Sequence, residues 1–235
     1  MQHAPLASNL AAKYQHLIQR LQQTAAEYPR AVLASSLGIE DVILMEIIVQ
    51  QNISIDMFTL ETGRLPEETL TLLQQLQDRY QNRIKVYFPQ AEQVESYVNQ
   101  HGINGFYQSI DLRKRCCYIR KVEPLQRALS GYHVWLTGVR SQQSVERSDL
   151  VLRTRDVPHN MDKINPLIDW REQEVWELAK YLQVPYNKLH DQHYPSIGCA
   201  PCSRAISKGE DFRAGRWWWE QESARECGLH LSPMK

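Results

Sequence analysis

A short apolar run, a turn and the beginning of a helix follow one another in Val32-Leu-Ala-Ser-Ser-Leu-Gly-Ile-Glu-Asp41. The free backbone N–H groups at such a helix start, with Gly38 and the Ser35 and Ser36 hydroxyls beside them, suit phosphate or sulfate oxygens. The stretch is not a Walker A loop, because no Gly-Lys-Ser/Thr follows. A helix N-cap that binds no ligand remains the alternative interpretation.

Strand and helix patterns alternate outward from this turn. Before it, apolar residues recur at helical spacing and predict an amphipathic helix over roughly residues 6–27; they are Leu10, Tyr14, Leu17, Ile18 and Leu21. Further patterns predict helices over about 40–51, 66–80, 90–100 and 113–129, and strands over about 31–34, 53–58, 84–88 and 133–137. Such alternation predicts an α/β domain with a mainly parallel sheet.

The periodicity changes toward the end of the chain. Asp169 with Glu172 forms a capping-box signature, and an apolar helix stripe follows that stops before Pro185. Beyond about residue 190 the periodicity fades, and Gly, Cys, Pro and Arg dominate. We therefore expect residues 1–190 to form an α/β nucleotide-binding domain with an N-terminal helix. Residues 191–235 are expected to form an irregular C-terminal segment laid over it.

Two more loops resemble the first in position. Leu60-Glu-Thr-Gly-Arg-Leu65 follows the second predicted strand, and Thr137-Gly-Val-Arg140 follows a later one. In a doubly wound sheet all three loops fall at the carboxyl edge, where ligands bind. Arg64, Gly138 and Arg140 are therefore candidates for a binding site at this edge.

Charge is balanced overall but not locally. The 235 residues carry a formal net charge of zero, so a general nucleic-acid or membrane footprint is not expected. Residues 113–121 nevertheless hold a cluster of cations with no acid among them; these are Arg113, Lys114, Arg115, Arg120 and Lys121. Such a cluster suits a small anionic ligand, and a solvated helix face is the alternative.

No feature of the sequence predicts secretion or membrane insertion. The beginning, MQHAPLASNLAAKYQ, has neither a basic leader nor a continuous apolar stretch, and the most apolar run, DVILMEIIV, is too short to span a bilayer. We expect a cytoplasmic protein with reduced cysteines, which there tend toward metal binding or catalysis.

The five cysteines fall into two pairs and a singleton. The pairs are Cys116-Cys117 and Cys199-Ala-Pro-Cys202. This count favours a four-thiolate centre plus one spare thiol, although the spacing alone selects no metal. A thioredoxin-type redox CxxC and ordinary buried thiols are the alternatives.

The spare thiol is Cys227, in Arg225-Glu-Cys-Gly-Leu-His230, and Arg213 and Arg216 precede it. Positive neighbours favour the thiolate, which is the reactive form, so this residue is a candidate nucleophile. Nearby, Trp217-Trp-Trp219 cannot place all three rings on one core face of a helix. At least one ring is expected to meet another surface, such as a closing tail or a partner protein.

These motifs together resemble one family, the assimilatory, thioredoxin-dependent adenylyl-sulfate reductases, which are relatives of the phosphoadenylyl-sulfate reductases. The resemblance covers roughly residues 30–231. It is carried by the three edge loops and by Cys116-Cys-Tyr-Ile-Arg-Lys121, Ile197-Gly-Cys-Ala-Pro-Cys-Ser-Arg204, Arg213-Ala-Gly-Arg-Trp-Trp-Trp219 and Glu226-Cys-Gly-Leu-His230. It implies an adenine-nucleotide α-hydrolase-like fold. It also implies that Cys116, Cys117, Cys199 and Cys202 ligate a 4Fe–4S cluster and that Cys227 attacks the substrate sulfur.

On this resemblance the substrate is adenylyl sulfate, with its adenosine near residues 60–65 and its phosphate near Ser35, Ser36 and Arg140. Its sulfate would be held by cations; the candidates are Lys121, Arg213 and Arg216, and His230 is a further expected contact. The fused thioredoxin-like domain of plant relatives is absent, so a separate thioredoxin or glutaredoxin-like protein would supply electrons. Glu61 and Ser203 stand where the family more often has Asp and Thr, and both keep the chemical group.

Two other functions stay open at this point. One is reduction of the 3′-phosphorylated nucleotide, although relatives specific for it usually lack both cysteine pairs. The other is a zinc-stabilised nucleotide-binding module without redox activity. The sequence does not predict the oligomeric state.

Overall fold

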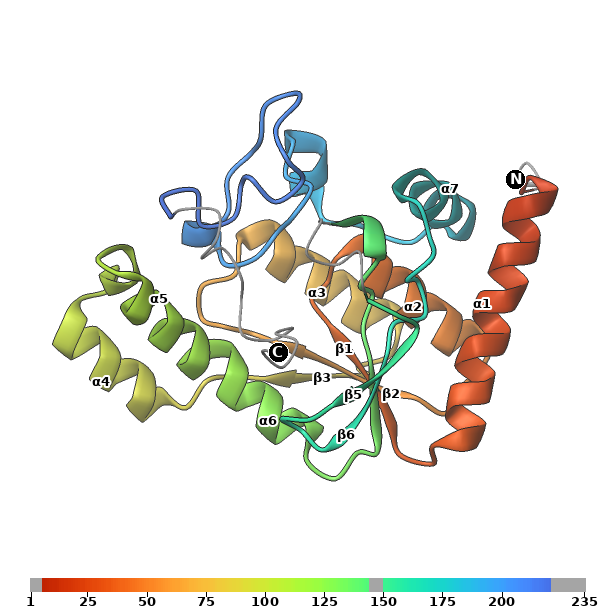
Figure 1. Ribbon diagram of the computed structural model, residues 1–235, viewed down its shortest axis with the longest axis horizontal. Helices are drawn as coiled ribbons and strands as arrows, with labels where there is room; N and C mark the ends of the chain where they lie inside the picture. The colour runs from red at the N-terminus through yellow and green to blue at the C-terminus, as the bar shows by residue number, and fades with distance from the viewer. Residues whose placement is uncertain (1–5, 144–149, 221–235) are drawn as a thin grey trace.

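The computed structural model describes residues 6–143 and 150–220, and within them it forms a six-stranded sheet (Figure 1). The strands are β1 (Ala31–Ser35), β2 (Asp56–Leu60), β3 (Ile84–Tyr87), β4 (Val134–Leu136), β5 (Arg153–Asp156) and β6 (Met161–Ile164), in the order β3-β2-β1-β4-β6-β5. Every neighbouring pair is parallel except β5 with β6. The predicted mainly parallel sheet is confirmed, and the strand order changes direction between β1 and β4.

Helices cover both faces of the sheet. On one face a large apolar core joins the strands to α1 (Ser8–Glu27), α2 (Ile39–Gln50), α3 (Glu67–Arg79) and α7 (Glu172–Leu182). On the other face, alternate strand residues such as Val32, Phe58 and Trp135 pack against α6 (Glu123–Leu129). Helix α5 (Ile110–Cys117) extends outward in line with α6, and α4 (Ala91–His101) lies beside α5 (Figure 1). Among the described residues, no helix combines the length and apolar character needed to cross a membrane.

Helix α2 is buried almost all the way round, as expected for a helix without a polar stripe. Its acidic residue Glu46 lies inside the core and accepts hydrogen bonds from Arg79 Nε at 2.8 Å, Arg79 Nη2 at 2.7 Å and the Tyr80 hydroxyl at 2.7 Å. A buried charge is tolerated when it is paired and hydrogen-bonded. These contacts explain how the apolar run of α2 accommodates a carboxylate.

Local patterns misplaced some boundaries. The predicted helix over 113–129 is three segments: α5, a π-helical turn at Tyr118–Val122, and α6. Strand β2 begins at Asp56 rather than residue 53, because the buried residues before it belong to the turn that leaves α2. The β5–β6 hairpin had no prediction. Its strands of four residues each, one rich in charge, lack a clear alternating pattern.

The capping-box prediction for the last helix was also wrong by two residues. The reciprocal contact is made by Arg171 and Glu174, with Glu174 Oε2 accepting from the Arg171 backbone N–H at 2.7 Å. Asp169 instead accepts two hydrogen bonds from the Arg20 guanidinium on α1. A long-range ion pair therefore takes the residue that local spacing assigned to the cap. The apolar stripe of α7 is buried as predicted.

Candidate active site

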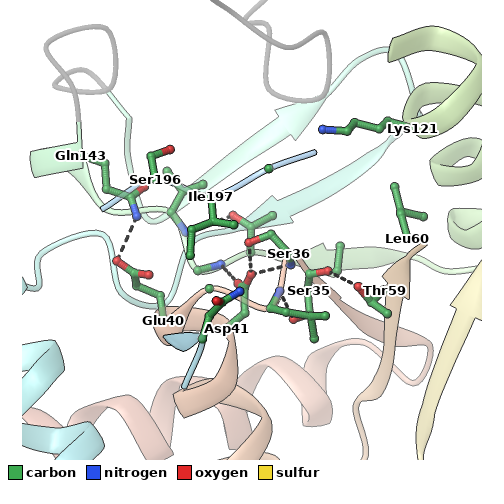
Figure 2. Close-up of a pocket in the computed structure, with 18 of the residues that line it drawn as sticks. Ser35, Ser36, Glu40, Asp41, Thr59, Leu60, Lys121, Gln143, Ser196 and Ile197 are labelled. Carbon is green, nitrogen blue, oxygen red and sulfur yellow. Dashed lines mark hydrogen bonds between the residues drawn. The ribbon is translucent and has the colours of Figure 1, made fainter. Parts of the chain in front are cut away.

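A cavity of about 240 Å³ opens at the carboxyl edge of the sheet, where the loops after β1, β2 and β4 meet. Ser35, Ser36, Leu60 and Thr59 line it from β1 and β2, and the segment around Ile197 crosses it from the C-terminal part of the chain (Figure 2). This is the point where the strand order reverses, the usual ligand site of open α/β sheets. The three loops that the sequence singled out therefore do form one site.

Asp41 holds two of these loops together. Its Oδ2 accepts from the Ser36 backbone N–H at 2.7 Å and the Ser36 hydroxyl at 2.8 Å, while its Oδ1 accepts from the Gly138 N–H at 2.8 Å. A Cβ at position 138 would lie 2.4 Å from Asp41 Oδ1, so only glycine allows this approach. Burial raises the pKa of Asp41 to about 6, against the opposing effect of the Ser36 hydrogen bonds.

This raised pKa gives a stability prediction. Because folding raises the pKa of Asp41 above its unfolded value, Asp41 favours the folded state most at low pH, and that contribution is lost as the pH rises through about 6. The difference in unfolding free energy between the wild type and Asp41→Asn should therefore change by about 2 kcal/mol between pH 4 and pH 7, the wild type losing the stability. Urea denaturation at several pH values measures it. A difference that stays flat with pH would contradict the assignment.

Arg140 lies behind the cavity wall rather than in it. Its side chain is 3% exposed, and its Nε donates to Glu40 Oε1 at 2.7 Å. Gln143 Nε2 donates to the same oxygen at 3.0 Å, the contact drawn between Glu40 and Gln143 in Figure 2. The phosphate contact expected of Arg140 stays a prediction. In the conformation described, Arg140 positions Glu40 and the loop after β4.

Three predicted sulfate-binding cations do line the cavity: Lys121, Arg213 and Arg216. Lys121 extends over the cavity from the π-helical turn (Figure 2). The extra residue of a π-turn changes the direction of the side chains, and such turns are frequent at functional sites. The neighbouring Arg120 is 6% exposed and donates through Nη1 to the Thr62 carbonyl at 2.6 Å.

The four paired cysteines surround a second, smaller cavity next to the first. Cys199 and Cys202 are buried, and Cys116 and Cys117 are half-buried. The Thr62 hydroxyl lies 3.3 Å from Cys199 Sγ. The fold therefore brings together two pairs that are about eighty residues apart in sequence.

Lys121, Trp217 and Arg216 connect the two cavities. Lys121 and Trp217 line both of them. Burial raises the pKa of Cys202 to about 11, and the charges of Lys121 and Arg216 oppose this rise. Arg120 likewise opposes the effect of burial, which raises the pKa of Cys116. The charges of the thiols and of these neighbouring cations therefore influence one another.

The thiol-lined cavity fits an iron–sulfur cluster by its chemistry. Four thiols form the donor set, cations border it, and the buried Trp217 Nε1 has no hydrogen-bond partner among the described residues. An indole N–H in this place is suited to a sulfur acceptor. Within residues 6–143 and 150–220, no three His, Cys, Asp or Glu side chains are arranged to hold a single metal ion. The thiols border a shared space instead of converging on one point.

Apart from Arg140 and the four paired cysteines, the predicted site residues fall into three groups. Those that line the main cavity are Ser35, Ser36, Gly38, Lys121, Gly138, Arg213 and Arg216. Arg64 instead lines the thiol cavity, where its guanidinium donates to the Ile103 carbonyl at 2.9 Å and to Asn104 Oδ1 at 3.0 Å. Cys227 and His230 lie outside the described residues.

Sequence reasoning missed four residues, namely Asp41, Thr62, Gln143 and Trp217. Asp41 carried a usable signal, because a carboxylate in the first turn after a Ser/Gly loop can accept from that loop. Thr62 and Trp217 carried none, since their roles depend on segments far away in sequence.

The strand order and the edge cavity define an open α/β protein with a ligand site at the switch point of its sheet, next to a second cavity lined by four thiols. Residues 30–205 match the family described as "Phosphoadenosine phosphosulfate reductase domain". The chain belongs to this family.

Curated relatives are similar in sequence to this protein over most of its length. The adenosine 5′-phosphosulfate reductase of Allochromatium vinosum is 51% identical over 213 residues, which cover 91% of this chain and 83% of the relative. That of Burkholderia cepacia is 47% identical over 227 residues, covering 97% of this chain and 91% of the relative.

Solved structures show the same fold. The phosphoadenylyl-sulfate reductase of Candida auris, in its phosphate complex, has a TM-score of 0.68 at 24% identity, covering 87% of this chain and 100% of that one. The FMN adenylyltransferase of Candida glabrata in complex with ATP has a TM-score of 0.58 at 10% identity, covering 99% and 81%. The expected adenine-nucleotide α-hydrolase-like fold is confirmed.

Proposed function

We propose that this chain reduces adenylyl sulfate to sulfite and AMP in sulfate assimilation, using a thioredoxin or glutaredoxin-like protein as the electron donor. The names and high identity of its relatives support the activity. The observation that carries the proposal is the shared wall of the two cavities, where Lys121 and Trp217 border both the anion site and the four thiols.

The main cavity provides complementary regions for the parts of this substrate. Phe58, Leu60 and Trp135 give an apolar wall for the adenine. The loop at Ser35 and Ser36 provides hydroxyls and a helix start for the phosphate. The sulfate then lies among the cations; these are Lys121, Arg213 and Arg216. Their charge stabilises both the bound anion and the negative charge that develops on the departing AMP.

The chemistry is a transfer of the sulfo group to a thiolate. Cys227 Sγ attacks the sulfate sulfur, the bond from sulfur to the phosphate oxygen breaks, and AMP leaves with that electron pair. The product is an enzyme S-sulfocysteine. A thiolate of the reducing protein then attacks Cys227 Sγ and sulfite leaves with the bonding pair. The second thiol of that protein resolves the mixed disulfide and restores the Cys227 thiolate.

The remaining parts have positional roles in this proposal. Gly228 gives the chain freedom next to the nucleophile, and His230 contacts the substrate. Residues 1–190 form the α/β domain in this proposal, and residues 191–235 form a C-terminal segment that packs on it.

Cys116, Cys117, Cys199 and Cys202 would hold a 4Fe–4S cluster. When bound, the cluster supplies a sulfur-rich negative centre that anchors the surrounding chain and influences the field at the anion site. Thr62 and Trp217 would supply hydrogen bonds to the sulfur ligands of such a group.

Two measurements on anaerobically purified protein test the function. We expect visible absorbance at roughly 400 nm and about four irons per chain. We also expect kcat/KM for adenylyl sulfate to exceed that for the 3′-phosphorylated nucleotide by at least about 10²-fold. A colourless, zinc-loaded protein that makes no sulfite would favour the nucleotide-binding module. The reverse substrate preference would favour a phosphoadenylyl-sulfate reductase.

A further inference from the structure

Several large apolar side chains are exposed beside the thiol-lined cavity. Ile103, Tyr107, Ile110 and Trp218 are 58%, 41%, 39% and 37% exposed. We call these four residues the apolar patch. They come from the 3-10 turn at Gly105–Tyr107 with its flanks, the first turn of α5, and the Trp217–Trp219 segment. Large apolar side chains that stay exposed in one region of a protein surface are typical of binding sites.

The patch is firmly attached to the cysteine segment beneath it. The Tyr107 hydroxyl donates to the Pro201 carbonyl, between Cys199 and Cys202, at 2.7 Å. The Tyr107 and Trp219 ring centroids are 4.5 Å apart, and Trp219 and Trp218 are 4.9 Å apart, both edge to face. A surface of pre-ordered rings loses little entropy on binding and so suits a protein partner.

One residue of the patch, Trp218, is close in sequence to Cys227, and this indicates which partner binds the patch. Trp218 lies two residues before Glu220, which is the last described residue and is anchored by Arg113 at 2.8 Å. Cys227 follows seven residues later, so the covalent chain can carry its thiol at most about 25 Å from that anchor. A protein that reduces an adduct on Cys227 has to dock within this radius.

The charged residues around the patch indicate what charge the contact surface of the partner carries. Lys114 and Arg115, both exposed, lie one turn after Ile110 on α5 and outnumber the single exposed acid there, Asp111. A basic rim beside an apolar centre is complementary to a partner with an apolar contact surface and acidic residues around it.

We propose that the apolar patch is the docking surface for the reducing protein. That partner is a small dithiol protein with an apolar surface next to its reactive cysteine and acidic residues around this surface. The inference rests on the proposed function and names the contact surface for its second half-reaction. Docking here places the donor thiolate within reach of Cys227 Sγ, where it displaces sulfite and takes its place as a mixed disulfide. The two electrons come from the donor dithiol, which ends as a disulfide.

The test is the double variant Ile103→Asp and Ile110→Asp. Both side chains are exposed, and an acid in the first turn of α5 favours the helix dipole, so the fold is kept. The matched control is Val157→Asp, a 63% exposed apolar residue at the β5–β6 turn. With thioredoxin as the electron donor, the double variant should raise KM for thioredoxin at least tenfold, and the control should not.

Two further readouts isolate docking from chemistry. Formation of the S-sulfocysteine in a single turnover, followed by mass spectrometry, and its release by dithiothreitol should be unchanged in the double variant. An unchanged KM for thioredoxin would overturn the proposal, as would an equal loss of release by dithiothreitol. A change in sedimentation with an unchanged KM would assign the patch to contact between copies of this chain. If the wild type forms no adduct with adenylyl sulfate, it is the proposed function that fails.

Discussion

Replacing Cys227 by serine is expected to lower sulfite production by at least about 10³-fold. At neutral pH a serine hydroxyl is not ionised and no base is assigned to activate it, whereas a cysteine among arginines is readily a thiolate. Initial rates of sulfite and AMP release with excess reducing protein measure the effect. AMP release should fall with sulfite release, because both follow the same attack.

Properties of the Cys227→Ser protein that do not depend on the nucleophile serve as the control. Absorbance, iron content and affinity for AMP should match the wild type, since the thiol-lined cavity and the anion site lie within other segments. Retained sulfite production would exclude Cys227 as the nucleophile.

Replacing Arg113 by methionine is expected to lower the free energy of unfolding by about 3–5 kcal/mol. The Arg113 and Glu220 side chains are 1% and 4% exposed, and Arg113 Nε and Nη2 donate to the two carboxylate oxygens at 3.0 and 2.8 Å. The variant leaves a carboxylate buried without its cation. It also removes the guanidinium that lies 4.9 Å from the Trp217 ring centroid, so the wall between the cavities should loosen.

Arg204→Met provides the matched comparison. Arg204 pairs with Glu210 at 2.6 Å with both side chains about one-third exposed, and loss of such a pair costs less than about 1 kcal/mol. Urea denaturation of both variants gives the difference. The double variant Arg113→Met with Glu220→Leu should recover much of the loss, because a buried pair can be exchanged for apolar groups at little net cost. Equal losses in the two single variants would contradict the role given to Arg113.

The layout of the fold and the edge site was within reach of the sequence. The stripe in α1 and the apolar runs of β1 and β4 are local patterns with fixed periods, and each marks a buried face. Parallel strands place their carboxyl ends at one edge, so the loops at Ser35 and Gly138 could be assigned to one site before any contact was known.

Other features were beyond local patterns. The cation cluster at 113–121 divides into buried Arg113 and Arg120, exposed Lys114 and Arg115, and cavity-lining Lys121. A sequence run gives their charge but not their partners, which are Glu220 and the Thr62 carbonyl, more than fifty residues away. The same holds for Arg64, which the sequence assigned to substrate and the structure ties to Ile103 and Asn104.

The sequence by itself determined the alternating α/β pattern, the three loops of the binding edge, and the count of two cysteine pairs and one further cysteine. These follow from periodicity, turn chemistry and composition, which act between near neighbours in the chain. Only the tertiary structure decided that Asp41 joins two loops, that four distant thiols share one cavity, and that Lys121 and Trp217 form the wall between that cavity and the larger cavity at the sheet edge. Those contacts arise from packing between segments far apart in sequence, and no local pattern encodes them.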